Sequence, residues 1–236
     1  MAIHNAPVKK IQGKLIFFEF CNAHVAKFNT PRHKICPMNI HTILPMLEKE
    51  VASYRVPVVD LIAVQTRDPF RILVATILSA RTRDEVTAKA AARLFKKASD
   101  LRSLAALTES EIAGLIYPVG FYKNKAGFLA KLPGAIQSLY GGRIPDNVAA
   151  LVKLPGVGRK TANLVVAVAF NKPAICVDTH VHRIMNIWGY VRTKTPHETE
   201  MVLRDKLPIE YWQRVNSILV AFGQATCRPQ RPCCDI

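Results

Sequence analysis

From Met38 onward, apolar residues recur with the spacing of a helix face, and an alternation with period two is found hardly anywhere. This pattern predicts an all-α protein with about ten short helices. Their expected limits are residues 39–53, 69–80, 84–97, 108–116, 122–140, 146–153, 159–170, 179–189, 196–206 and 208–222.

Helix starts are marked by residues that cap the first turn. These signals are Asp68 before Pro69, Thr108 with Glu111, and Thr195-Pro196 with Glu198. One apolar stretch, "FNKPAICVDTHVHR" at residues 170–183, has the composition of a strand but is short and isolated. We therefore expect it to be an extended linker.

The chain is strongly basic, because it has 33 Lys and Arg but only 17 Asp and Glu, which gives a formal net charge of +16. Such a surplus favours a polyanionic partner, with nucleic acid first and an anionic membrane surface second. No run reaches the roughly 18 to 20 apolar residues of a spanning helix. The sequence therefore predicts a chain that does not cross a membrane.

Residues 1–37 are basic and contain a short apolar patch that Glu19 interrupts, with no clear cleavage site after it. We expect a poorly ordered extension, or sequence upstream of a true start at Met38, rather than a signal peptide. A leader that directs translocation is the remaining alternative.

Six cysteines are unevenly placed, at positions 21, 36, 176, 227, 233 and 234. Because this spacing does not suit a disulfide scaffold, it favours a reducing, cytoplasmic location, and the last three point to a metal.

The stretch "LPGVGRKTAN", residues 154–163, places two glycines before a helix that is expected to begin at Arg159. We expect Gly156 and Gly158 to adopt positive φ, so that backbone N–H groups at the helix start can hold a DNA phosphate. An ordinary turn between two helices is the alternative.

Eighteen residues after Lys160 comes Asp178, in "VDTHVHRI". With these residues the chain resembles the helix-hairpin-helix DNA glycosylases, and specifically their endonuclease III branch. The similarity runs from about Pro69 to the last residue, through the segments "ILSARTRDEVT", "PVGFYKNKA", "LPGVGRKTANLVV", "VDTHVHRI" and "AFGQATC".

This resemblance implies a two-lobed all-α fold with a central helical barrel. The barrel domain would span residues 62–172 and end in the hairpin, while residues 38–61 and 173–236 would form the second, discontinuous lobe. The expected partner is duplex DNA that contains damaged bases or abasic sites, bound by a monomer between the lobes.

The resemblance also implies that Lys160 attacks C1′ of a flipped nucleotide and that Asp178 assists. The helix start and the neighbouring Arg159 would ease loss of the amine proton. The resulting imine allows β-elimination, which cuts the strand 3′ to the site. The expected enzyme is thus a glycosylase and AP lyase acting on oxidised pyrimidines. The alternatives are a surface lysine and an Asp178 that serves only as a helix N-cap.

Arg159 and four further side chains would contact DNA. Arg81 matches the family position whose side chain fills the gap left by the flipped nucleotide, and Phe121 matches an apolar wedge between bases. Lys123 and Lys125 would face phosphates. The alternatives are a solvated Arg81 and a Phe121 packed in the core.

His180 and His182 stand two residues apart, which does not place two imidazoles on one helix face for a metal. His180 matches the family motif and is expected to support DNA binding. His182 is expected to be solvated or packed.

Relatives of this family carry a [4Fe–4S] cluster on four cysteines spaced C-x6-C-x2-C-x5-C. Cys227 and Cys234 match the first two positions, and the third would fall just beyond Ile236. Cys233 lies off the pattern. Two explanations fit the missing ligand positions: the natural sequence continues past Ile236, or the gene is truncated. We expect the former.

Two other functions stay open. A mismatch glycosylase that removes thymine shares this superfamily, whereas "GRKTAN" and "VDTHV" argue against the adenine-removing members. A non-catalytic helix-hairpin-helix module that only grips DNA would explain the charge and the glycines, but not the pair of Lys160 and Asp178.

Overall fold

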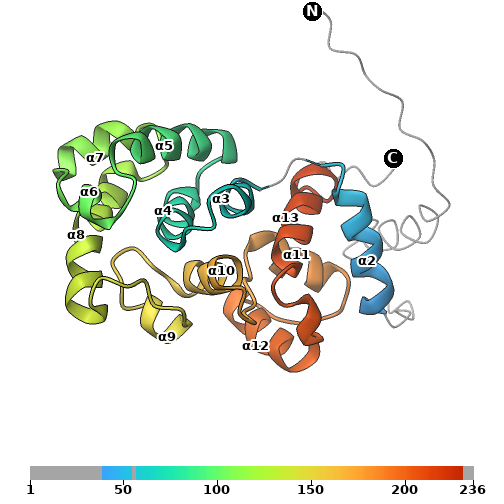
Figure 1. Ribbon diagram of the computed structural model, residues 1–236. Helices are drawn as coiled ribbons and strands as arrows, with labels where there is room; N and C mark the ends of the chain where they lie inside the picture. The colour runs from blue at the N-terminus through green and yellow to red at the C-terminus, as the bar shows by residue number, and fades with distance from the viewer. Residues whose placement is uncertain (1–38, 55–56, 231–236) are drawn as a thin grey trace, which may run out of the picture.

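The computed structural model describes residues 39–54 and 57–230, and within them the chain is helical with no strand (Figure 1). The all-α prediction is confirmed. The helices are α2 Ile40–Val51, α3 Val58–Thr66, α4 Pro69–Ser79, α5 Asp84–Lys97, α6 Leu101–Ala105, α7 Glu109–Ile116, α8 Tyr122–Tyr140, α9 Val148–Leu151, α10 Arg159–Phe170, α11 Thr179–Ile187, α12 Pro196–Lys206 and α13 Val215–Ala225, with a 3₁₀ helix η1 at Ile209–Tyr211. The segments expected at residues 1–37 and at Cys233 and Cys234 lie outside the described residues.

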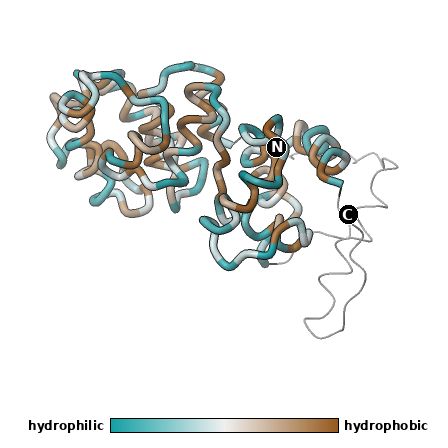
Figure 2. Tube along the Cα trace, turned by 90° about the horizontal axis from the view of Figure 1, so that it is seen from below, coloured by the Kyte–Doolittle hydropathy of each residue, from teal (hydrophilic) through white to brown (hydrophobic). Residues whose placement is uncertain are grey.

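Two hydrophobic cores organise these helices. The first takes buried residues from Phe70 through Ala174, and the second combines residues 40–47 with residues 175–227. Figure 1 shows the same division, with α4 to α9 on one side, α2 and α11 to α13 on the other, and α10 between them. Most helices carry both hydrophobic and hydrophilic positions, as Figure 2 shows, because each helix buries one face.

Helix α3 packs in a small third cluster that bridges to the first core. Its Val58 and Val59 contact Ile72 of α4, and Leu164 of α10 lies against the same cluster. The domain limits drawn from the sequence stay a prediction. Val58 and Val59, which that prediction placed in the second lobe, pack here with Ile72 of α4.

The expected helix starts are confirmed, because each capping residue makes its bond. The Asp68 carboxylate accepts from the Phe70 amide at 2.9 Å, with Pro69 in the first turn. Thr108 and Glu111 form a reciprocal capping box, with bonds of 3.2 and 2.7 Å. Thr195 accepts from the Glu198 amide at 3.2 Å.

Three parts of the helix prediction were wrong. The helices α3 and α6 were not expected, since α3 follows Pro57, which offers no capping side chain, and α6 is only five residues long. The helix expected over residues 208–222 is instead η1 followed by α13. Residues 171–178 belong to no helix or strand, as expected of the linker, whereas residues 179–183 of that stretch belong to α11.

Candidate active site

The hairpin joins α9 to α10 through residues 152–158. Gly156 has φ +74°, and a Cβ there would lie 2.8 Å from the Phe128 ring, so this position requires glycine. Gly158 has φ −85° and ψ 172° and is the N-cap of α10, so the expectation of positive φ was wrong for Gly158. A Cβ at Gly158 would meet nothing within 4 Å. Local backbone geometry therefore does not explain this second glycine.

The start of α10 is open to an anion. Gly158 has no side chain, and no side chain caps the first turn of α10. A 12-residue helix presents unbonded N–H groups and the positive end of its dipole at such a terminus. The hairpin thus has the geometry of a phosphate site, in which glycine at position 158 keeps the approach clear.

Lys160 and Asp178 come together at this helix start. Lys160 lies in the first turn of α10, and its Nζ is 3.8 Å from Oδ2 of Asp178. The Lys160 side chain is 54% exposed, whereas that of Asp178 is 9% exposed. The pair therefore combines a solvent-accessible amine with a nearly buried carboxylate.

Asp178 has a second task in the fold. It is the N-cap of α11, and its Oδ1 accepts hydrogen bonds from the amides of His180 and Val181, both at 2.9 Å. The two carboxylate oxygens thus have different partners: Oδ1 caps the start of α11, and Oδ2 faces Lys160. The N-cap role considered from the sequence is confirmed, and the assistance that Asp178 would give to Lys160 stays a prediction.

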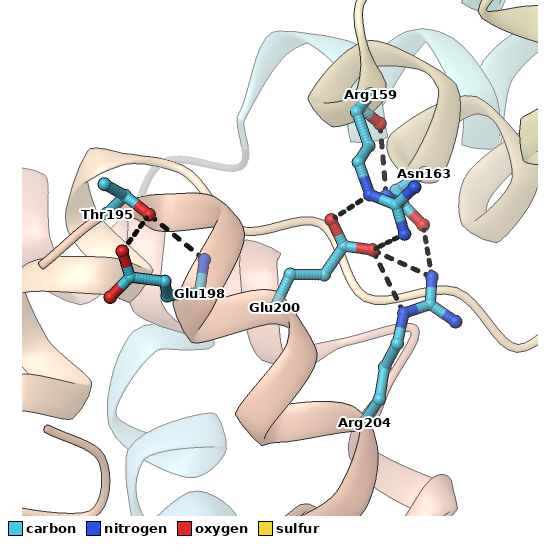
Figure 3. A network of polar contacts seen from close by, with 6 residues as sticks. All are labelled: Arg159, Asn163, Thr195, Glu198, Glu200 and Arg204. Atoms are coloured by element: carbon cyan, nitrogen blue, oxygen red, sulfur yellow. Dashed lines mark hydrogen bonds and ion pairs between the residues drawn. The ribbon is translucent and has the colours of Figure 1, made fainter. Parts of the chain in front are cut away.

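Arg159, which was expected to contact DNA, makes an ion pair inside the protein (Figure 3). Its Nε and Nη2 donate to the two carboxylate oxygens of Glu200 in α12, at 2.8 and 2.9 Å. Arg204 donates to the same carboxylate at 3.0 Å and to Asn163 at 3.1 Å. The charge of Arg159 is compensated by this ion pair while its side chain stays 45% exposed, so its contact with DNA stays a prediction.

The same network ties the two cores together. Glu200 is almost fully buried and belongs to α12, while Arg159 and Asn163 belong to α10. The Asn163 amide donates back to the Arg159 carbonyl at 3.1 Å. Glu200 was missed from the sequence, where it reads as one of several charges on a polar helix. It sets the position of α10, and with it that of Lys160, relative to α12.

His180 follows Asp178 and is packed tightly. Its Nδ1 lies 3.2 Å from Nη2 of Arg183, and a Cβ at Gly223 of α13 would approach that nitrogen to 2.4 Å. Burial lowers the pKa of His180 below its usual 6.5. Its support of DNA binding stays a prediction, and Gly223 is a further residue on which the site depends.

His182 is packed against a neighbouring side chain, which is one of the two alternatives expected from the sequence. Its Nδ1 lies 2.7 Å from Oγ1 of Thr199. Across residues 39–54 and 57–230, no group of three or more His, Cys, Asp or Glu is arranged to hold a metal ion.

Arg81 and Phe121 lie next to each other. Both have positive φ, at 54° and 58°, and the Arg81 guanidinium carbon is 5.6 Å from the centroid of the Phe121 ring. Phe121 is 60% exposed, which excludes the alternative of core packing. Their predicted roles toward DNA stay predictions, but the two side chains share one exposed site.

The two lysines that follow differ. Lys123 is exposed, in agreement with a contact to phosphate. Lys125 is 6% exposed and its Nζ is bonded inside the protein, so the expectation that it faces phosphates was wrong. Its place on the buried stripe with Leu129, Leu132 and Ile136 of α8 was the sequence signal that could have shown this.

Cys227 is 6% exposed, and Cys234 lies outside the part of the chain that the structure describes. These two cysteines supply half of the ligand set that the resemblance implies, which does not fit a cluster held by four thiolates from this sequence. Within the described ranges, no helix has the length and hydropathy that a membrane crossing needs.

Comparisons with known proteins show the family to which the chain belongs. Residues 74–208 match the family described as HhH-GPD superfamily base excision DNA repair protein. Endonuclease III of Thermotoga maritima is 48% identical over 168 residues, which cover 71% of this chain and 79% of the relative. The chain spans 55% of Endonuclease III-like protein 1 of Bos taurus, at 44% identity.

Comparison with solved structures also finds endonuclease III and a related DNA glycosylase. A trapped Endonuclease III–DNA covalent intermediate superposes with a TM-score of 0.74 at 36% identity, covering 82% of this chain and 88% of that one. A thermostable thymine-DNA glycosylase superposes with a TM-score of 0.70 at 26% identity, covering 82% and 90%.

Proposed function

The chain belongs to the HhH-GPD superfamily of base excision DNA repair proteins, as an endonuclease III-type DNA glycosylase and AP lyase, and from this premise we propose which residues act and on which lesions. Its substrate is duplex DNA that carries an oxidised pyrimidine. Lys160 is the nucleophile, and Asp178 is the carboxylate that assists it.

The chemistry follows from the two side chains. Lys160, once it has lost a proton, forms a bond from Nζ to C1′ while the bond from C1′ to the base breaks and its electron pair leaves with the base, which takes up a proton. The sugar ring then opens to an imine. Loss of a proton from C2′ expels the 3′ phosphate, which cuts the strand.

Asp178 contributes by charge and position. Its Oδ2, 3.8 Å from the amine, can accept the proton that Lys160 loses and can stabilise positive charge that develops on the sugar. Its nearly complete burial strengthens this interaction, because a carboxylate shielded from water acts across a lower dielectric.

The residues around this pair would hold the DNA. The amides at the start of α10 would bind a phosphate, and Lys123 would bind another. Arg81 and Phe121 would enter the stack where the target nucleotide has been flipped out. His180 would support the same strand from α11.

One observation carries the proposal, namely the separation of 3.8 Å between Lys160 Nζ and Asp178 Oδ2 at an open helix start. A module that only grips DNA needs the hairpin amides and the basic surface, but it does not need an amine beside a buried carboxylate.

The lesion class is tested with matched duplexes that contain an oxidised pyrimidine, a G·T mismatch or no lesion. We expect base release and strand cleavage to be at least tenfold faster with the oxidised pyrimidine. Faster release of thymine from the mismatch would assign the protein to the mismatch glycosylases. Binding without base release or cleavage of any duplex, including one with an abasic site, would leave only a DNA-binding module.

The phosphate site is tested with a substitution at each hairpin glycine. Gly158→Ser is expected to keep the melting temperature, because serine is at least as good an N-cap as glycine. It should nevertheless weaken binding to duplex DNA about tenfold or more, since its side chain would occupy the amides that a phosphate needs. Fluorescence anisotropy at fixed salt measures this affinity.

Gly156→Ala is the matched control. It is expected to lower the free energy of unfolding by about 1–2 kcal/mol, because alanine is strained at φ +74° and its Cβ would meet the Phe128 ring. If Gly158→Ser binds DNA as tightly as the parent protein, phosphate does not bind at these amides.

A further inference from the structure

Lys125 is a buried cation that the proposed chemistry does not use. It lies in α8, four residues after Phe121, and its side chain is folded inward. Its Nζ donates to the carbonyl oxygens of Leu78 at 2.8 Å and Ala80 at 2.6 Å, and to Oγ1 of Thr82 at 3.2 Å. The three protons of the ammonium thus have three acceptors.

These acceptors lie at the C-terminal end of α4 and in the turn after it. Leu78 is in the last turn of α4, and Ala80 is its C-cap. Carbonyl groups at a helix C-terminus lack partners within the helix and carry the negative end of the dipole, so a cation is favoured there. Lys125 therefore fixes the end of α4 from a different helix.

The turn that Lys125 holds carries Arg81, and the segment before α8 carries Phe121. The two backbones touch, because the Gly120 amide donates to Thr82 Oγ1 at 3.2 Å and a Cβ at Gly120 would lie 2.5 Å from the Arg81 carbonyl oxygen. Lys125 is linked to both sides, since its own amide donates to the Phe121 carbonyl at 3.0 Å.

We propose that Lys125 is a positioning residue that holds Arg81 and Phe121 at a fixed separation, so that both side chains can enter the gap left by a flipped nucleotide. It does this without touching DNA. The inference rests on the roles assigned above to Arg81 and Phe121.

Two observations support a positioning role. Arg81 and Phe121 both adopt positive φ, a conformation that non-glycine residues keep only where the surroundings hold them. Burial lowers the pKa of Lys125 from 10.5 to about 8, so the ammonium is retained at this place against a cost in solvation.

The test compares Lys125→Met with Lys131→Met, an exposed lysine on the same helix. Methionine keeps the length and the apolar stem but cannot donate to the three acceptors. Nucleotide flipping is followed by the fluorescence of 2-aminopurine opposite the lesion, and base release is followed in duplex DNA. Borohydride trapping on single-stranded DNA with an abasic site, where no gap must be filled, reports on Lys160 alone.

We expect Lys125→Met to reduce flipping and base release at least tenfold while trapping on the single strand stays within twofold of the parent, and Lys131→Met to change none of them. An equal loss in all three assays would show a general defect of the fold, and no loss in any would show that the loops hold without Lys125. Either result overturns the inference.

Thr82→Val serves if Lys125→Met does not fold, because it removes one acceptor of Lys125 and the contact to Gly120. It should also reduce flipping, by a smaller factor than Lys125→Met does. An unchanged amplitude of the 2-aminopurine fluorescence would overturn the inference. Arg81→Ala and Phe121→Ala test directly whether these two side chains take part in nucleotide flipping. If these variants flip normally, the assignment of Arg81 and Phe121 fails, whatever Lys125 does.

Discussion

Lys160→Gln is expected to abolish cleavage of duplex DNA at an abasic site, by about a thousandfold or more, while leaving DNA binding within a few-fold of the parent protein. Glutamine has a similar length but no nucleophilic amine, so neither the bond to C1′ nor the imine can form. The Lys160 side chain is 54% exposed and caps no helix, so its loss should not change the melting temperature. Cleavage under single-turnover conditions measures the effect.

Borohydride reduction gives the same prediction a covalent readout. The parent protein should become joined to a strand that contains an abasic site, and Lys160→Gln should not. Lys153→Gln, at an exposed lysine of the same hairpin, is the control and should trap like the parent. Equal trapping by Lys160→Gln and the parent would refute the assignment of Lys160.

Asp178→Asn is expected to reduce base release by roughly a hundred- to ten-thousandfold with little loss of stability. Asparagine can still accept from the amides of His180 and Val181, since it is as good an N-cap as aspartate. It has no negative charge to offer the Lys160 amine or the sugar. The comparison is made by base release in single turnover and by thermal unfolding of the same samples.

Asp178→Ala completes this comparison, because alanine loses both functions of the side chain. It should show the same loss of base release as Asp178→Asn and, in addition, a loss of about 1 kcal/mol in the free energy of unfolding from the missing cap. Should Asp178→Asn release base at the parent rate, the carboxylate would be a helix cap alone.

Much of the fold was determined by short-range signals. The starts of α4, α7 and α12 follow from a capping residue and its neighbours within four positions, and these interactions persist whatever packs around the helix. The hairpin and the order of Lys160 and Asp178 were likewise visible as local motifs. The helices α3 and α6 were missed. Helix α3 has no capping side chain, whereas α6 has a capping box formed by Asp100 and Ser103 but is only five residues long.

The tertiary structure alone decided which charges meet. Arg159 finds Glu200, 41 residues away, and Lys125 finds the end of α4, 43 to 47 residues away. The first pair forms where helices of the two cores meet, and the second forms within the first core. Burial then makes a partner obligatory for Glu200 and for Lys125. By itself the sequence determined the helical class and the hairpin, and it predicted Lys160 and Asp178 as the reactive pair. Only packing decided that they lie within 3.8 Å and which cations stay available to DNA, because those distances depend on contacts between segments that are remote in the chain.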